Sequence, residues 1–132
     1  MSQVDAKANR PLSPHLTIYR PIITMVMSIV HRITGCALFF GTLLVMWWLV
    51  AAASGPDAFA TANGFFGSWI GIIILFGYTW ALMHHMLGGL RHFVWDSIHG
   101  FDEKPREMLA WATLIGSVSL TILLWIVGLI VI

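Results

Sequence analysis

The stretch Ile33–Ala53, ITGCALFFGTLLVMWWLVAAA, has 21 residues and no formal charge. A helix needs about 20 apolar residues to cross the hydrocarbon core of a bilayer. The stretch does not alternate with the period of two that a strand of a membrane β-barrel requires. It therefore predicts a transmembrane helix.

Two further runs of the same kind follow, Phe65–Met83 with 19 residues and Met108–Ile132 with 25. Only 10% of the 132 residues are charged, which is too little polar surface for a soluble domain of this size. Because a bilayer offers no water to backbone groups, each run is expected to be helical. We predict an all-α membrane protein with three transmembrane helices, at about 26–53, 65–95 and 106–132. A segment with Pro11, Pro14 and Pro21 precedes them, so we divide the chain into an N-terminal arm, 1–21, and a three-helix anchor domain, 22–132.

The basic residues are distributed unevenly. All seven lie before the first charge-free run or between the second and third: Lys7, Arg10, Arg20, Arg32, Arg91, Lys104 and Arg106. By the positive-inside rule, we expect a cytoplasmic N-terminus and a periplasmic C-terminus. About 30 residues precede the first run, and the start of the chain is not rich in Arg and Ser, so neither a signal peptide nor an organelle transit peptide is indicated. We expect a multi-pass protein of the bacterial inner (cytoplasmic) membrane.

One group of polar residues, Ser28, His31 and Arg32, falls at the cytoplasmic end of the first helix. Residues three and four apart share a helical face, so these side chains are expected to form one polar pocket. Serine and arginine both donate hydrogen bonds, which suits a carbonyl or a carboxylate. The alternative is that Arg32 only extends to lipid headgroups and His31 makes an interfacial contact.

A second group is the stretch His84–Asp96, HHMLGGLRHFVWD, at the cytoplasmic end of the second helix. His85, Gly88, Gly89 and His92 are spaced i, i+3, i+4 and i+7 and so lie on one stripe. Imidazole is a good axial ligand of haem iron, and glycines one turn away leave room for a flat macrocycle. The alternative is a structural, hydrogen-bonded histidine. Arg91 and Asp96 either pair with each other or bind haem propionates. The single cysteine, Cys36, excludes a multi-cysteine metal site on this chain.

These residues resemble the signatures of a known family. The segments Arg10–Tyr19 (RPLSPHLTIY), Ser28–Gly35 (SIVHRITG) and His85–Asp96 (HMLGGLRHFVWD) are similar to those of the cytochrome b membrane-anchor subunit of succinate dehydrogenase (complex II, succinate:quinone oxidoreductase). The first segment is most like the mitochondrial and alphaproteobacterial branch. The motifs, their order and the three spans together cover nearly the whole chain.

The resemblance implies roles for individual residues. His85 matches the axial ligand of haem b, with the second ligand supplied by a second membrane-anchor subunit, so that the three helices form half of a heterodimeric haem-binding bundle. His31 and Arg32 match residues near the haem propionates, Gly89 packs against the haem, and Ser28 and Arg32 line the ubiquinone site. The doublet leaves His84 as a rival ligand, but the spacing of His85 to the rest of the motif favours His85.

The resemblance also implies a function. The chain would pass electrons from succinate oxidation to ubiquinone, linking the tricarboxylic acid cycle to the respiratory chain, with a flavoprotein and an iron–sulfur protein as further partners. It would have no catalytic residues of its own for succinate, and no nucleic-acid partner is expected. Two alternatives stay open: a self-contained haem protein ligated by His31 and His85, and a small proton-relay or transporter subunit.

Overall fold

The computed structural model describes residues 15 and 18–131 of the chain. Within this part, four helices follow one another: α2 (Ile23–Ser54), α3 (Pro56–Gly67), α4 (Trp69–Asp96) and α5 (Glu103–Val131). Three of them, α2, α4 and α5, are long and apolar enough to cross a membrane. The prediction of an all-α protein with three transmembrane helices is therefore confirmed.

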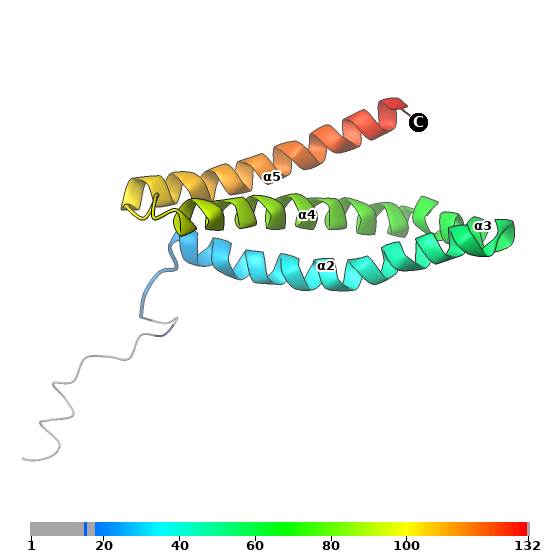
Figure 1. Cartoon of the computed structure of the whole chain (residues 1–132), viewed down its shortest axis with the longest axis horizontal. Helices are drawn as coiled ribbons and strands as arrows, with labels where there is room; N and C mark the ends of the chain where they lie inside the picture. Colours follow the sequence, from blue (N-terminus) through cyan, green and yellow to red (C-terminus); the bar gives the residue numbers. More distant parts are fainter. Residues whose placement is uncertain (1–14, 16–17, 132) are drawn as a thin grey trace, which may run out of the picture.

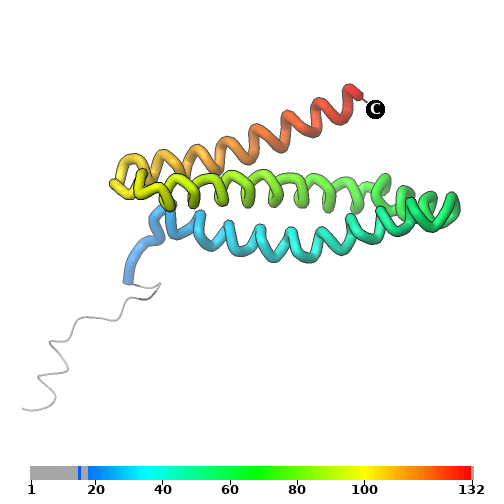
Figure 2. Tube along the Cα trace, viewed as in Figure 1, coloured from blue at the N-terminus to red at the C-terminus, as the bar shows by residue number. Residues whose placement is uncertain are grey.

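Helix α4 lies between α2 and α5 (Figure 1). The start of α2, the end of α4 and the start of α5 gather at one end of the molecule, and the short helix α3 lies at the other. The Cα trace shows α5 diverging from α4 toward its C-terminal end (Figure 2). This arrangement places both polar groups, one at the start of α2 and one at the end of α4, at the same end of the bundle.

The helix ends agree with the predicted spans to within a few residues. Helix α2 begins at Ile23 and α5 at Glu103, in each case three residues before the predicted span. Of the predicted arm, 1–21, only residues 15 and 18–21 are described, and 18–21 are not helical. Residue 132, the predicted end of the third span, also lies outside the described residues.

The predicted second span, 65–95, differs from the structure at its start. Residues 65–67 belong to α3, and α4 begins only at Trp69. Ser68, between the two helices, has an extended backbone (φ −71°, ψ 159°), and its hydroxyl oxygen accepts a hydrogen bond from the Gly71 amide at 3.2 Å. Serine is a favoured residue at this position because its side chain satisfies an amide left free at a helix start. Hydropathy did not reveal the break, since the residues on both sides of it are apolar.

The junction between α3 and α4 brings two backbones close together at Gly71. A Cβ atom there would lie 2.2 Å from the carbonyl oxygen of Phe65 and 2.7 Å from Cα of Phe66. Because the atoms that the added Cβ would meet belong to the backbone, they cannot move aside as the end of a flexible side chain could. We expect Gly71→Ala to lower stability by about 1–3 kcal/mol, the usual cost of overpacking, measured as thermal unfolding of the purified complex.

Gly77, on the same helix, is the matched control. A Cβ added there meets no heavy atom within 4 Å in the described part of the chain. Gly77→Ala should leave the unfolding temperature unchanged or raise it slightly, because alanine is the better helix former. Equal effects of the two substitutions would show that the close approach at Gly71 does not constrain the fold.

The interior between the helices is built from small and hydroxylated residues. The buried residues of these kinds in the described part of the chain are Thr34, Ala51, Ala62, Gly71, Ala81, Gly88, Ala110, Thr113, Ser117 and Thr121, and Met27, His84 and Arg91 are buried with them. Small residues let membrane helices approach closely, and hydroxyls bond within or between helices. Large apolar side chains instead point outward along all three long helices, as expected for a protein surrounded by lipid and by other membrane chains.

Candidate functional site

Three histidine rings meet where the start of α2 faces the end of α4. The rings of His31 and His85 are stacked, with centroids 3.9 Å apart and planes 6° from parallel. The ring of His92 lies 5.6 Å from that of His31. The two polar groups recognised separately in the sequence therefore form one cluster.

Glycines from both helices make this stack possible. A Cβ at Gly88 would come within 2.4 Å of Nδ1 of His31, and one at Gly35 would come within 3.1 Å of Cε1 of His85. A Cβ at Gly89, by contrast, meets no heavy atom of the described chain within 4 Å. The space left by Gly88 is thus used by His31 of the same chain, and only the space beside Gly89 stays open.

The hydrogen bonds of His85 determine which of its nitrogens carries the proton. Nδ1 lies 3.1 Å from the carbonyl oxygen of His31, which can only accept, so Nδ1 donates. The hydroxyl of Thr34, 3.3 Å from the same nitrogen, itself donates to the His31 carbonyl and is free to accept. In a neutral ring this leaves the lone pair on Nε2. A histidine whose other nitrogen is held by a carbonyl in this way is well oriented to bind a metal through Nε2.

His84 points away from this cluster, toward α5. It is fully buried, and its Nδ1 lies 3.2 Å from the hydroxyl of Ser117. That hydroxyl donates to the carbonyl of Leu114, so it accepts from His84. Nε2 of His84 has no partner among the described residues, but the closed packing around it leaves no path for a macrocycle. The two neighbouring histidines thus have different environments, one buried against α5 and one facing α2.

The stacked rings do not suit the hypothesis of one haem bound between His31 and His85. Two axial ligands must direct nitrogens at the iron from opposite faces of the macrocycle. Rings that lie face to face with centroids 3.9 Å apart leave no room for a haem plane between them.

A cavity of about 180 Å³ adjoins the cluster. Seven residues line it: Thr24, Ser28, His31 and Arg32 from α2, and Arg91, His92 and Trp95 from α4. The cavity thus contains the whole predicted pocket of Ser28, His31 and Arg32. Its described lining includes two arginines and no carboxylate.

Arg91 and Trp95 are the residues of this cavity whose role the sequence did not define. The guanidinium of Arg91 lies over the indole of Trp95, 5.1 Å from the ring centroid. Nε and Nη1 of Arg91 have no hydrogen-bond partner among the described residues, and the predicted alternative of a pair with Asp96 is not formed there. Trp95 gave no signal in the sequence, because a tryptophan near a helix end usually marks the membrane interface.

Sequence reasoning also missed Thr34 and Ser117, the hydroxyls that hold His85 and His84. Ser117, on α5, provides the polar partner of a buried histidine on α4. A hydroxyl in the middle of an apolar helix is the signal that was available, but it does not say which helix the hydroxyl faces.

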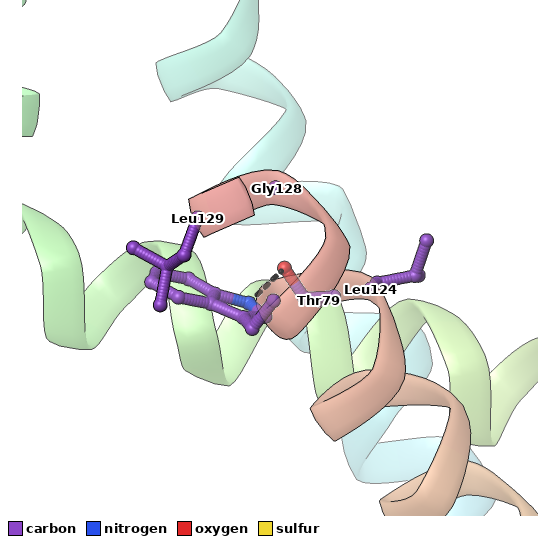
Figure 3. Close-up of a pocket in the computed structure, with 5 residues that line it drawn as sticks. Thr79, Leu124, Gly128 and Leu129 are labelled. Carbon is purple, nitrogen blue, oxygen red and sulfur yellow. Dashed lines mark hydrogen bonds between the residues drawn. The ribbon is translucent and has the colours of Figure 1, made fainter. Parts of the chain in front are cut away.

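Another pocket lies between α4 and α5, away from the histidines (Figure 3). It measures about 350 Å³, and within it Nε1 of Trp125 donates to the hydroxyl of Thr79 at 3.3 Å. Its other described lining residues are Leu124, Gly128 and Leu129. With no ionisable group in that lining, the pocket offers no chemistry comparable to the histidine cluster.

Comparison with known proteins identifies the family of the chain. The profile of the family described as succinate dehydrogenase/fumarate reductase transmembrane subunit matches residues 6–124. The chain is 47% identical over 121 residues to the succinate dehydrogenase cytochrome b556 subunit of Paracoccus denitrificans, covering 92% of this chain and 93% of that one. It is 39% identical over 117 residues to the subunit of the same name from Rickettsia conorii, covering 89% and 91%.

A mitochondrial protein is similar as well. The succinate dehydrogenase cytochrome B subunit of Schizosaccharomyces pombe is 37% identical over 118 residues, which cover 85% of this chain and 65% of that one. The family match, residues 6–124, extends over α2 and α4 and through most of α5. The chain therefore belongs to the family of succinate dehydrogenase/fumarate reductase transmembrane subunits.

Proposed function

We propose that this chain is the cytochrome b membrane-anchor subunit of succinate dehydrogenase, which holds haem b with a partner anchor and helps to form the ubiquinone-reduction site. The observation that carries the proposal is the cluster at one end of the bundle. There, His85 has its Nδ1 fixed by a carbonyl and lies beside a cavity lined by Ser28, His31 and Arg32. Relatives named cytochrome b556 subunits support it.

His85 is the proposed axial ligand of the haem iron, through Nε2. Its rival His84 is enclosed by packing against α5, whereas His85 is only partly buried. The open space beside Gly89, one turn from His85, is where the edge of a macrocycle would pack. The second ligand would come from the partner anchor, because His31 is stacked on His85 rather than opposed to it. Haem b, when bound, would supply a one-electron carrier at this end of the bundle.

His31 and Arg32 are proposed to face the haem propionates. His31 and Arg32 both line the cavity, where Arg32 adds a fixed positive charge. Nδ1 of His31 is buried beside Gly88 and has no hydrogen-bond partner among the described residues. Carboxylates are bound well by guanidinium groups, which present several donors in one plane.

Ser28 and Arg32 are proposed to bind the quinone. Both are exposed residues of α2 and both line the cavity, so a ligand can reach them from outside this chain. The Ser28 hydroxyl would donate a hydrogen bond to a quinone carbonyl. Arg32 would stabilise the negative charge that develops on that oxygen as the quinone takes up electrons.

The residues at this end of the bundle also support a proposed orientation in the membrane and the remaining partners. The described basic residues and both polar groups lie there, which favours a cytoplasmic N-terminus and a periplasmic C-terminus in a bacterial inner membrane. We propose that the cytoplasmic end is where a flavoprotein and an iron–sulfur protein assemble on the anchor. A proton relay has less support, because the charge-free runs of all three spans offer no continuous set of ionisable groups toward the other side.

The test is purification of this chain under native conditions from its own membranes. We expect a flavoprotein, an iron–sulfur protein and a second small membrane protein to co-purify, with a reduced b-type spectrum and succinate:ubiquinone reductase activity. A preparation of this chain with no haem spectrum and no succinate-dependent quinone reduction would refute the proposal.

A further inference from the structure

The loop between α4 and α5 holds an isoleucine in a conformation that normally belongs to glycine. Beyond the end of α4, the amide of Ile98 donates to the carbonyl of Trp95 at 2.8 Å. The next amide, of His99, donates to the carbonyl of Val94 at 3.3 Å. Helices that end in this pair of bonds place the residue at position 98 in the left-handed region, where glycine is preferred. Ile98 has φ 63°, which is unfavourable for a β-branched side chain.

Burial within the described chain does not compensate for this strain. The side chain of Ile98 is 83% exposed, more than that of any other large apolar residue in the part of the chain that the structure describes. Gly100 is different, because its φ is also positive but an added Cβ would lie 3.0 Å from Cδ1 of Leu109. At position 98 glycine would suit the backbone better and would remove an exposed apolar group. The isoleucine therefore calls for a partner outside the described residues.

Lipid tails do not supply that partner. Helix α4 has 28 residues and is about 42 Å long at 1.5 Å per residue, whereas the hydrocarbon core is about 30 Å thick. The charge-free run of this span ends at Met83, so the excess length lies at the end that carries the loop. Ile98 is thus outside the hydrocarbon core.

A second apolar residue of the same loop is exposed as well. Phe101 is 58% exposed, and one part of its ring lies against Trp95, with centroids 6.4 Å apart and planes 23° from parallel. Trp95 in turn lines the cavity that contains Ser28 and Arg32. The loop therefore presents two apolar side chains to the outside directly beside that cavity.

Carboxylates surround these apolar side chains. Of the five Asp and Glu residues in the described chain, four lie at or next to the loop, all exposed, with two basic residues among them: Asp96, Asp102, Glu103 and Glu107, and Lys104 and Arg106. The anionic surface of a bilayer attracts basic segments and repels an excess of carboxylates. Apolar residues within a charged border are instead typical of a protein interface, and an acidic border favours a partner with a basic one.

We infer that Ile98 and Phe101 form a docking surface for the iron–sulfur protein, which would receive them in an apolar pocket bordered by basic side chains. This inference rests on the proposed function, which already places that protein at this end, and it adds the residues that make the contact. The iron–sulfur protein is chosen over the flavoprotein because the electron donor to the quinone has to lie next to the cavity that Trp95 lines. The strained isoleucine would then be retained for binding rather than for folding.

The test measures how fast succinate-oxidising activity leaves washed native membranes, assayed in the supernatant with a soluble artificial acceptor. In Ile98→Gly the rate of release should rise about tenfold, because loss of a buried apolar anchor acts mainly on dissociation. The haem spectrum of the membranes should be unchanged, since glycine suits the backbone at this position. If Ile98 served folding alone, glycine would leave the release rate unchanged or lower it, and that result would overturn the inference.

Three further variants separate the apolar contact from the backbone. Ile98→Leu keeps the apolar side chain and the strain, so its release rate should stay within twofold of wild type. Ile98→Asn relieves the strain but is polar, and should resemble Ile98→Gly. Ser97→Ala is the matched control, because its exposed hydroxyl bonds only to the Val94 carbonyl of its own helix, and it should release at the wild-type rate. Fast release in Ile98→Leu, or slow release in Ile98→Asn, would contradict an apolar contact.

A crosslinking experiment identifies the partner directly. A p-benzoylphenylalanine introduced at position 98 and illuminated in native membranes should form its adduct with the iron–sulfur protein. Adducts with lipid, with the flavoprotein or with residues 1–21 of this chain would each overturn the inference. Wild-type membranes that hold no succinate-oxidising activity would instead overturn the proposed function.

Discussion

Replacing His85 with alanine should abolish the b-type absorption of the complex. The bond from Nε2 of His85 is the only one that we propose between this chain and the haem iron. His31 already occupies the space beside Gly88, and it would have to leave that space to take the place of His85. The fit there is close, because a Cβ added at Gly88 would lie within 2.4 Å of Nδ1 of His31. The measurement is a dithionite-reduced minus oxidised spectrum of complex purified through a protein of the assembly other than this chain.

His84→Ala is the matched control, because it alters the neighbouring histidine. His84 is fully buried against α5, so its removal leaves a cavity and should cost about 2–5 kcal/mol of stability. Ser117 keeps its hydrogen bond to the Leu114 carbonyl, so no new unpaired hydroxyl is created. We expect a lower unfolding temperature but an unchanged haem spectrum.

The pair of variants separates ligation from folding. If His84→Ala removes the spectrum and His85→Ala keeps it, the ligand assignment is wrong. If both remove it while the complex still assembles, the buried contact of His84 with Ser117 supports the site indirectly, and His85 is no longer distinguished as the ligand.

Hydropathy was sufficient to predict the three long helices, because a helix that crosses a bilayer needs about 20 consecutive apolar residues. It could not predict the break at Ser68. That break depends on one side chain that accepts from the Gly71 amide, in the middle of residues that are apolar on both sides. Local hydrogen bonding, which average hydropathy does not detect, decided the start of α4.

The site was predicted in its members but not in their mutual arrangement. Helical spacing placed Ser28, His31 and Arg32 together, and the structure finds all three lining one cavity. Spacing also put Gly88 and Gly89 on one stripe, yet the approach of His31 from α2 gives the two glycines different surroundings. The direction from which a second helix approaches is a tertiary property, and the sequence of one helix does not contain it.

The same reason explains the histidine doublet. Neighbouring residues on a helix point about 100° apart, so His84 and His85 had to face different neighbours. Which of them faces α5 depends on the packing of α4 against both other helices. Ser117, which lies 33 residues after His84, identifies that face only in the folded chain.

Ser28→Ala should slow succinate-dependent ubiquinone reduction by about 10-fold, the effect of losing roughly 1.4 kcal/mol of hydrogen bonding to the quinone. Arg32→Gln should have the larger effect, on the order of 100-fold, because a hydrogen bond to a charged group is worth about 1.5–3 kcal/mol. Oxidation of succinate with a soluble artificial acceptor should be unchanged in both variants, since that reaction does not use the cavity. The measurement is steady-state turnover with each acceptor on the same purified complex.

Two comparisons connect these losses to the cavity. Ser54→Ala removes an exposed serine at the far end of the same helix, where its hydroxyl donates to the Val50 carbonyl, and should leave quinone turnover intact. Arg32 is proposed to face a haem propionate as well as the quinone, so Arg32→Gln should also lower the haem potential, whereas Ser28→Ala should not. Loss of turnover without a change of potential in both variants would place Arg32 at the quinone alone. Full quinone reduction in both would show that the cavity between α2 and α4 does not bind the quinone, even in a complex that retains its haem.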